Sequence, residues 1–282
     1  MFKYASALGI ANASGHKVIL PRHEFLWRDF PNLSAVKRSK PANNFSHQAN
    51  VHERRWASFD EQVLTQAQSY TRKHVQLSGY FQSFKYFQHL GDSLRTELTA
   101  ASRYINAATS FTRSRLSYHL SQLKYVDQAV TASDVTLVGV HVRRSDMLGD
   151  AQQEQGYTTA PKQYFLRAMR YMRSTLKPHC LFVVASDDPD WCKRNLRATD
   201  VIFTDDLDFS LYPQLHWDVL EMTVLRQTQA CIISTGSFSW WIGWLTNAET
   251  TIYYSKFPRD DSSLSDGFTR DDYFPEDWIA ME

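Results

Sequence analysis

The chain has 282 residues, of which 43% are hydrophobic and 14% aromatic, so it is long and apolar enough for one large domain or two lobes. This composition excludes an intrinsically disordered chain. Thirty-one basic and thirty acidic residues leave a formal charge of +1, which excludes a broad surface for nucleic acids or anionic lipids, so any anion site must be local.

The first half of the chain predicts a mixture of helices and loops. Apolar residues at helical spacing predict helices over residues 1–14, 58–72 and 90–118, and a strand-like run covers residues 17–20. Residues 31–51 are rich in Asn, Ser and Pro, which predicts a loop. The aromatic stretch LSGYFQSFKYF separates the second helix from the third.

The second half alternates regularly between strands and helices. Strands are predicted over residues 135–142, 180–185, 201–204, 230–234 and 250–253, and helices over residues 161–176, 190–197, 213–228 and 238–246. Such alternation predicts βαβ units and a parallel sheet covered on both faces. We therefore predict an α/β fold with two lobes, residues 1–125 and 131–282, joined near residues 120–134.

Three short features bear on the cellular compartment. The cysteines at positions 180, 192 and 231 are too few for a disulfide scaffold, although one bridge and one free thiol would fit a secretory enzyme. The tripeptides at 12–14, 32–34 and 44–46 match the N-glycosylation acceptor pattern, which is common by chance. The sequence has no signal-peptide pattern and no run of about 18 apolar residues.

Polar side chains follow four of the predicted strands at the point where each strand ends. They are Arg143, Arg144 and Asp146; Ser186, Asp187 and Asp188; Asp205, Asp206 and Asp208; and Ser234, Thr235, Gly236 and Ser237. In an open α/β sheet these positions share the edge at which ligands bind. Arginine forks match phosphate oxygens, and backbone N–H groups at a helix start attract anions. A carboxylate such as Asp188 can accept hydrogen bonds from guanine, so this edge predicts a nucleoside-diphosphate site.

Each of these residues also has an ordinary structural explanation. Arg143 and Arg144 could form a strand-end ion pair with Asp146, and a lone His141 is more often a core residue than a ligand contact. Asp188 followed by Pro189 is a common helix start. Asp206 and Asp208 could hold a divalent metal, or they could simply be solvated. Only their coincidence along one edge favours a binding site.

The chain resembles the α1,2-fucosyltransferase family, glycosyltransferase family 11. The stretch HVRRSD resembles the His-x-Arg-Arg-x-Asp motif of fucosyltransferases that use GDP-fucose. Six blocks along nearly the whole chain resemble those of this family in order: MFKYASALGIA, GYFQSFKYF, VGVHVRRSD, FVVASDDPDWCKRNL, CIISTGSFSWWIGWL and FPEDWI. The resemblance implies a GT-B-like fold of two Rossmann-like lobes that face a donor and acceptor cleft. It also implies inverting transfer of L-fucose from GDP-fucose to the 2-hydroxyl of a terminal β-galactoside, with no cofactor and no metal.

The resemblance also implies roles for individual residues. Arg143 would bind the diphosphate and stabilise the leaving group, with Arg144 and Asp146 bracing the motif, and His141 with Asp188 would contact guanine. Residues 234–237 would lie near the phosphates, and the acceptor side would include Tyr80, Gln82 and Ser83. Apart from GDP-fucose and a galactose-terminated glycan, no nucleic acid or other partner is implied.

Two positions depart from the family pattern. Ser145 stands where the family usually has Gly, and the family block Gly-Asn-Gln-Met-Phe, which follows a strand, is matched only from Met1 onward. We therefore expect the first strand of the acceptor-side lobe to lie outside this chain. The resemblance also implies a glycoprotein of the Golgi lumen that is held as a type II membrane protein. We expect its membrane anchor, like the first strand, to lie outside this chain. Two alternatives remain: another GDP-fucose-dependent enzyme, such as the core N-glycan α1,6 type, and a non-catalytic GDP-sugar or glycan-binding fragment.

Overall fold

The computed structural model describes residues 1–282 except 22–25, 39–47, 71–72, 177 and 247. The chain divides into two compact units. The first contains Met1–Thr99 and Asp261–Glu276, and the second contains Ala100–Asp260 and Asp277–Glu282. Each unit is an α/β structure with parallel strands, which confirms the predicted fold class.

The second unit is built on a six-stranded parallel sheet with the order β10-β9-β8-β5-β6-β7. Its strands are β5 (Val135–Val142), β6 (His179–Ser186), β7 (Val201–Phe203), β8 (Ala230–Ile233), β9 (Thr250–Tyr254) and β10 (Ile279–Met281). Every residue of β5 and β8 is buried, as expected for a sheet covered on both faces. The first five strands confirm the sequence prediction, whereas β10 was missed.

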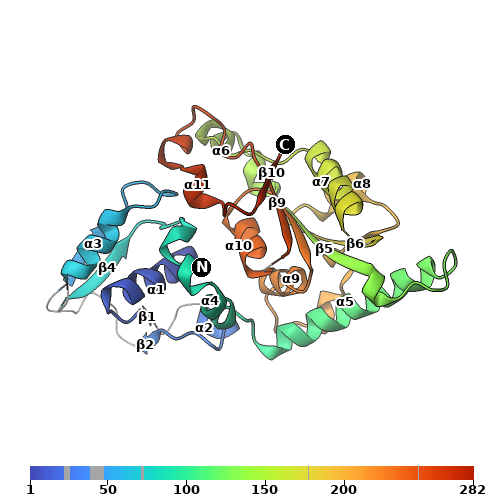
Figure 1. Cartoon of the computed structure of the whole chain (residues 1–282), viewed down its shortest axis with the longest axis horizontal. Helices are drawn as coiled ribbons and strands as arrows, with labels where there is room; N and C mark the ends of the chain where they lie inside the picture. The colour runs from blue at the N-terminus through green and yellow to red at the C-terminus, as the bar shows by residue number, and fades with distance from the viewer. Residues whose placement is uncertain (22–25, 39–47, 71–72, 177, 247) are drawn as a thin grey trace. The chain divides into compact units, whose positions relative to one another are not determined.

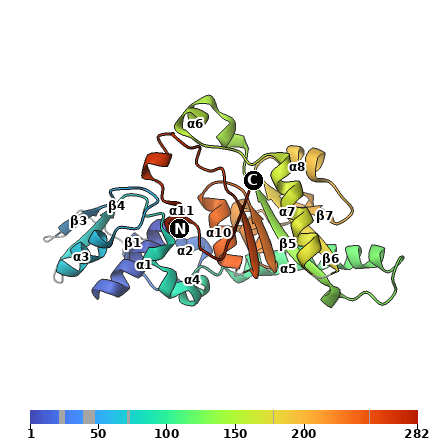
Figure 2. The ribbon, with the colours of Figure 1, turned by 45° about the horizontal axis from the view of Figure 1, so that its top comes forward.

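Helices cover the two faces of this sheet (Figure 1; Figure 2). The helices of this unit are α5 (Ser102–Leu123), α6 (Asp150–Gln155), α7 (Lys162–Thr175), α8 (Pro189–Leu196), α9 (Trp217–Leu225) and α10 (Ser237–Thr246), of which α6 lies apart from the sheet. The pair α7 and α8 packs on one face, and α9 and α10 pack on the other. Pro189 begins α8 and the Asp188 side chain caps it, which explains why this helix starts there.

The boundary between the units differs from the predicted one. Helix α5, which the sequence placed in the first lobe, belongs to the second unit. Its residues Leu116, Leu120 and Leu123 pack against a cluster in the sheet that contains Val135 and Leu137. The predicted helix over residues 90–118 is in fact two helices, α4 (Gly91–Glu97) and α5, and the break between them marks the boundary.

The first unit contains two separate parallel strand pairs. Strand β1 (Ile19–Pro21) pairs with β2 (Val36–Arg38), and β3 (Gln48–His52) pairs with β4 (His74–Ser78). Its other helices are α1 (Phe2–Ser14), α2 (Leu26–Asp29), α3 (Glu61–Ser69) and α11 (Arg270–Tyr273). The prediction of loop over residues 31–51 was therefore wrong at β2 and β3, and the tripeptide at 44–46 lies outside the described residues. A side chain at Gly9 would overlap the Tyr86 carbonyl, so glycine is required where α1 packs on the aromatic segment.

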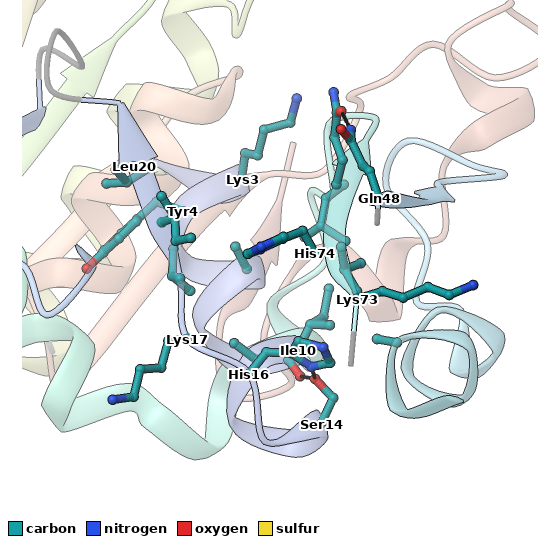
Figure 3. A pocket seen from close by; sticks show the side chains of 18 of the residues that line it. Lys3, Tyr4, Ile10, Ser14, His16, Lys17, Leu20, Gln48, Lys73 and His74 are labelled. Carbon is teal, nitrogen blue, oxygen red and sulfur yellow. Dashed lines mark hydrogen bonds between the residues drawn. The ribbon is translucent and has the colours of Figure 1, made fainter. Parts of the chain in front are cut away.

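A cavity of about 800 Å³ lies between β1 and β4 and runs along α1. Figure 3 shows Leu20 of β1 and His74 of β4 at this cavity, with Tyr4 and Ile10 projecting from α1. Among the described residues, β1 and β4 each pair with one strand only. The Val36 N–H donates to the Val18 carbonyl, and the Glu53 N–H donates to the Ser78 carbonyl. Backbone polar groups of successive residues in a strand point to alternate sides. The N–H and C=O groups of Ile19 in β1 therefore point away from β2, and those of Val75 and Leu77 in β4 point away from β3.

Two further expectations concern cysteines and membranes. All three cysteines are buried free thiols, so the predicted possibility of one disulfide bridge was wrong. Cys180 lies in β6, Cys192 in α8 and Cys231 in β8. Within the described ranges, we find no helix with the length and hydropathy needed to cross a bilayer.

We predict that an apolar strand joined ahead of Met1 will pair with β1 and β4. A short extension of valine and isoleucine residues should raise the melting temperature of the first unit. It should also slow hydrogen exchange at the amides of Val75 and Leu77, because these groups gain acceptors. The control extension carries proline at alternate positions, which removes the N–H donors. Equal protection with both extensions would contradict the prediction.

Candidate functional site

The candidate site lies at the carboxyl ends of the strands of the second unit. Strands β5, β6 and β7 extend the sheet in one direction, whereas β8 adds on the other side of β5. The topology therefore reverses between β5 and β8, and this is the point at which open α/β sheets bind ligands. Arg143 follows β5, and Ser234 follows β8. The Arg143 N–H donates to the Ser234 hydroxyl at 2.8 Å, which ties the two strand ends together.

Arg143 forms a bidentate ion pair with Asp146. Its Nε and Nη2 donate to the two carboxylate oxygens at 2.9 and 2.6 Å. This pairing holds the pKa of Asp146 below its usual range, so both groups are charged at neutral pH. The Arg143 side chain remains one-third exposed. The guanidinium is therefore oriented by the protein and still accessible to an anion.

Arg144 and two aspartates after β6 form a second polar cluster. The Asp187 carboxylate accepts hydrogen bonds from the backbone N–H groups of Arg144 and Ser145 at 2.8 and 3.1 Å. The Arg144 guanidinium stacks over the ring of Trp191 at 4.1 Å and lies 3.5 Å from Asp188. Asp188 also accepts from the Trp191 N–H, so the ordinary explanation of this residue as a helix cap holds. Sequence reasoning missed the part played by Asp187 in fixing the turn after β5.

His141 lies inside the unit rather than on its surface. Its side chain is buried, and Nδ1 is 2.6 Å from the Ser239 hydroxyl, which is 3.2 Å from the Ser234 hydroxyl. Burial, with a smaller contribution from Arg143, lowers the pKa of His141 to about 3, so the imidazole is neutral. His141 thus joins β5 to α10 through the Ser239 hydroxyl, which in turn contacts Ser234 at the end of β8.

The turn from β8 to α10 has the features of an anion-binding segment. Ser234 and Thr235 are buried, whereas Ser237 at the start of α10 is exposed. Gly236 has a φ of 89°, and a side chain there would approach Met147. Helix α10 has ten residues, and its amino end lies at this edge. The first backbone N–H groups of an α-helix have no acceptor within the helix and attract anions.

The acidic residues after β7 are already paired. Lys193 lies 2.7 Å from Asp205 and 3.2 Å from Asp206, and Asp208 accepts from the backbone and hydroxyl of Ser210. Across the part of the chain that the structure describes, no group of three or more His, Cys, Asp or Glu side chains could hold a metal ion. The possibility of a metal at Asp206 and Asp208 thus has no support in the geometry.

The acceptor-side candidates belong to the first unit and follow β4. Tyr80 is 67% exposed, Gln82 is half-buried, and Ser83 is fully buried. The Ser83 hydroxyl donates to the Asp272 carbonyl at 2.7 Å and accepts from the Lys85 N–H, so it has partners within the unit. Tyr80 is therefore the most accessible of the three.

Two carboxyl groups with raised pKa values, half-buried Glu53 and buried Glu221, were missed by the sequence analysis. Burial raises the pKa of Glu53, after β3, to about 7, and does the same for Glu221 in α9. Glu221 accepts from the Thr204 hydroxyl at 2.6 Å, and the charges of Asp205, Asp187 and Asp218 add to the increase. Neither residue lies in a recognised motif. The fold alone places Glu53 at the ends of β3 and β4 and places Glu221 against Thr204, the residue that follows β7.

A family model, "Glycosyl transferase family 11", matches residues 1–282, which is the whole chain. The chain belongs to glycosyl transferase family 11. This confirms the family resemblance of its six sequence blocks.

The curated relatives include galactoside alpha-(1,2)-fucosyltransferase 1 of Bos taurus and of Saimiri boliviensis boliviensis, each 29% identical over 209 residues. These residues are 73% of this family 11 chain and 53% and 52% of the two relatives, so the match spans about half the length of the relatives.

Solved structures with similar folds include fucosyltransferase NodZ from Bradyrhizobium, with a TM-score of 0.45 and 12% identity over 86% of this chain and 87% of that chain. Another is FUT1 of Arabidopsis thaliana in complex with GDP, with a TM-score of 0.48 and 11% identity over 89% and 66% of the two chains. These scores are too low to indicate a function.

We predict that Glu221 makes stability depend on pH. A carboxyl whose pKa rises from 4.5 to about 7 on folding binds its proton more tightly in the native state. The contribution of Glu221 to the free energy of unfolding is complete below pH 4.5. This contribution, on the order of 3 kcal/mol, is lost as the pH rises through 7. Glu221→Gln, which stays neutral and can still accept from Thr204, should remove this part of the pH dependence. Urea unfolding at pH 5 and pH 8 measures the change, with exposed Glu249→Gln as the control. Parallel pH curves for wild type and Glu221→Gln would contradict it.

Proposed function

We propose that this chain is the catalytic part of a GDP-fucose-dependent fucosyltransferase that transfers L-fucose to the 2-hydroxyl of a terminal β-galactoside. The assignment of GDP-fucose as the donor rests on one observation. Arg143 is oriented by Asp146 and accessible to an anion, and it follows β5 where the strand order reverses, beside the amino end of α10. Family membership and the names of the curated relatives support the acceptor half.

In the proposed reaction, the galactose 2-hydroxyl attacks the anomeric carbon of fucose from the face opposite the phosphate. The new C–O bond forms as the bond to the β-phosphate breaks, GDP leaves with the electron pair, and the hydroxyl proton passes to water. Negative charge grows on the β-phosphate in the transition state. Arg143 and the backbone N–H groups that begin α10 would stabilise this charge, by on the order of 3 kcal/mol for one well-placed donor.

The ion pair with Asp146 suits Arg143 to this role. Asp146 fixes the guanidinium plane before the donor arrives, so little side-chain entropy is lost on binding. A diphosphate carries more charge than one carboxylate and can bind the exposed part of the fork. We therefore assign the phosphate contact to Arg143 and the orientation of Arg143 to Asp146.

The remaining donor residues divide into contacts and supports. Asp188 and the Arg144 guanidinium on Trp191 would border the guanine, and Thr235, Gly236 and exposed Ser237 would border the phosphates. His141 and Ser234 would act from beneath, because both side chains are buried and hydrogen-bonded. On the acceptor side, the exposed Tyr80 ring would stack on the CH-rich face of galactose, next to the Gln82 amide.

The test is transfer from GDP-fucose to a β-galactoside and to its 2-deoxy analogue. We expect product only with the first acceptor, and NMR of that product should show an α1,2 linkage. Fucose on the 2-deoxy sugar, or on N-acetylglucosamine, would support a different acceptor specificity. Binding of GDP without any transfer would instead support a non-catalytic GDP-sugar-binding protein.

We predict that Arg143→Lys will reduce kcat by about 100-fold, because an ammonium cannot reproduce the bidentate fork at the diphosphate. The matched control is Arg173→Lys. Arg173 forms a similar bidentate pair with Asp200, which precedes β7 at the opposite end of the sheet, so this change should leave the rate within about twofold. Initial rates at saturating donor measure both variants. A near wild-type rate for Arg143→Lys would remove the assigned role.

A further inference from the structure

Glu53 lies where the two paired strands of the first unit end. Strands β3 and β4 run in register to His52 and Ser78, and the Glu53 N–H donates to the Ser78 carbonyl at 2.9 Å. Glu53 and Gly79 are therefore the first residues beyond the carboxyl ends of this strand pair. Ligand-binding residues of α/β folds concentrate at such ends.

The backbone after β4 wraps around the Glu53 carboxylate. The Tyr80 N–H donates to Oε2 at 2.6 Å. The nearby N–H groups of Phe81 and Gln82 also favour the charged form, and the Gln82 N–H itself donates to the Trp56 carbonyl at 3.1 Å. A side chain at Gly79, where φ is 143°, would come within 2.4 Å of the Glu53 Cβ. Only glycine therefore allows the chain to pass this close to the carboxylate.

The same segment contains a strained residue. Phe81 has a φ of 52°, which is unusual for a residue other than glycine and costs about 1–3 kcal/mol. Its side chain is fully buried, and its carbonyl accepts from the buried Ser6 hydroxyl of α1 at 2.8 Å. The surroundings thus hold residues 79–82 in one conformation, from which the Tyr80 ring projects into solvent.

We propose that Glu53 is a positioning residue for the acceptor: its carboxylate holds the backbone of residues 79–82 in the conformation that presents Tyr80. The inference rests on the proposed function only in taking the ligand of Tyr80 to be the sugar acceptor. The Glu53 side chain itself need not touch the sugar, since its Oε2 acts through the Tyr80 amide.

The electrostatics of Glu53 make this positioning depend on pH. Burial raises the pKa of the carboxyl to about 7, against the opposing effects of the three N–H groups and the Lys3 ammonium on α1. Tyr86, the other titratable group that interacts with Glu53, stays neutral because burial raises its own pKa further. The Glu53 Oε1 is buried and accepts no hydrogen bond from any residue that the structure describes. Below pH 7 the carboxyl gains a proton, and the hydrogen bond that it accepts from the Tyr80 N–H weakens.

The first test follows the hydrogen bond itself. In protein carrying isotope-labelled tyrosine, the Tyr80 amide proton shift should titrate with a midpoint near pH 7, and Tyr80→Phe assigns the signal. Glu53→Gln keeps an acceptor oxygen but has no proton to lose, so the titration should disappear. A Tyr80 amide shift that is constant from about pH 5 to pH 9 in wild type, or titrates equally in Glu53→Gln, would overturn the proposal.

The second test links the loop to the acceptor. We expect the acceptor KM of wild type to rise about tenfold from pH 8 to pH 6, the size expected for weakened hydrogen bonds to a charged group. The kcat and the affinity for GDP should change little. Glu53→Gln should show a high acceptor KM that does not vary with pH, whereas Glu61→Gln, an exposed carboxyl at the start of α3, should behave as wild type.

The two tests separate this inference from the proposed function. If no β-galactoside is fucosylated at any pH, the proposed function fails, and the Tyr80 titration alone decides the role of Glu53 in the loop. If transfer occurs but the acceptor KM of Glu53→Gln keeps the wild-type pH profile, the positioning role is wrong. Melting temperatures within a few degrees of wild type would show that the variants are folded.

Discussion

The hydrogen bond from the Arg143 backbone to the Ser234 side chain is the contact on which the donor-side edge depends. It joins the ends of β5 and β8, where the order of strands reverses, and it continues through Ser239 to the buried imidazole of His141. Because this chain of polar groups is buried, a member that lost its partner would stay desolvated without compensation. The position of the Arg143 backbone relative to α10 is therefore set by the core, and the ion pair with Asp146 then orients the guanidinium.

Much of the second unit and of its edge could be predicted from the sequence. Its strands are continuous apolar runs, and a parallel sheet places whatever follows those runs at one edge, so the residue pattern was enough to group Arg143, Asp188 and Ser234. The pattern could not reveal which groups would face each other. The sequence offered both an Arg143–Asp146 ion pair and a core position for His141 as alternatives to ligand contacts, and the structure shows both. Strand periodicity could not decide between the alternatives, because it does not specify side-chain directions.

The first unit was harder to predict, for physical reasons. Strands β2 and β4 are short and partly exposed, so they lack the continuous apolar signal of β5. Glu53 carries no local signal at all, because its environment is made by the glycine at position 79 and by N–H groups that follow a different strand. The unit boundary was misplaced since α5 has apolar residues at helical spacing, and that spacing does not say which sheet they cover.

The cavity between β1 and β4 also bears on how this chain behaves at high concentration. A strand with an unsatisfied edge is a template for another polypeptide, and natural proteins normally blunt such edges with charge, proline or a covering element. Here the edge of β1 ends at Pro21, which offers no donor, whereas the edge of β4 presents Val75 and Leu77 with neither charge nor proline between them. Intermolecular strand pairing at β4 would compete with the native fold of the first unit. Among the described strands, β4 is thus one edge at which another polypeptide could add by backbone pairing.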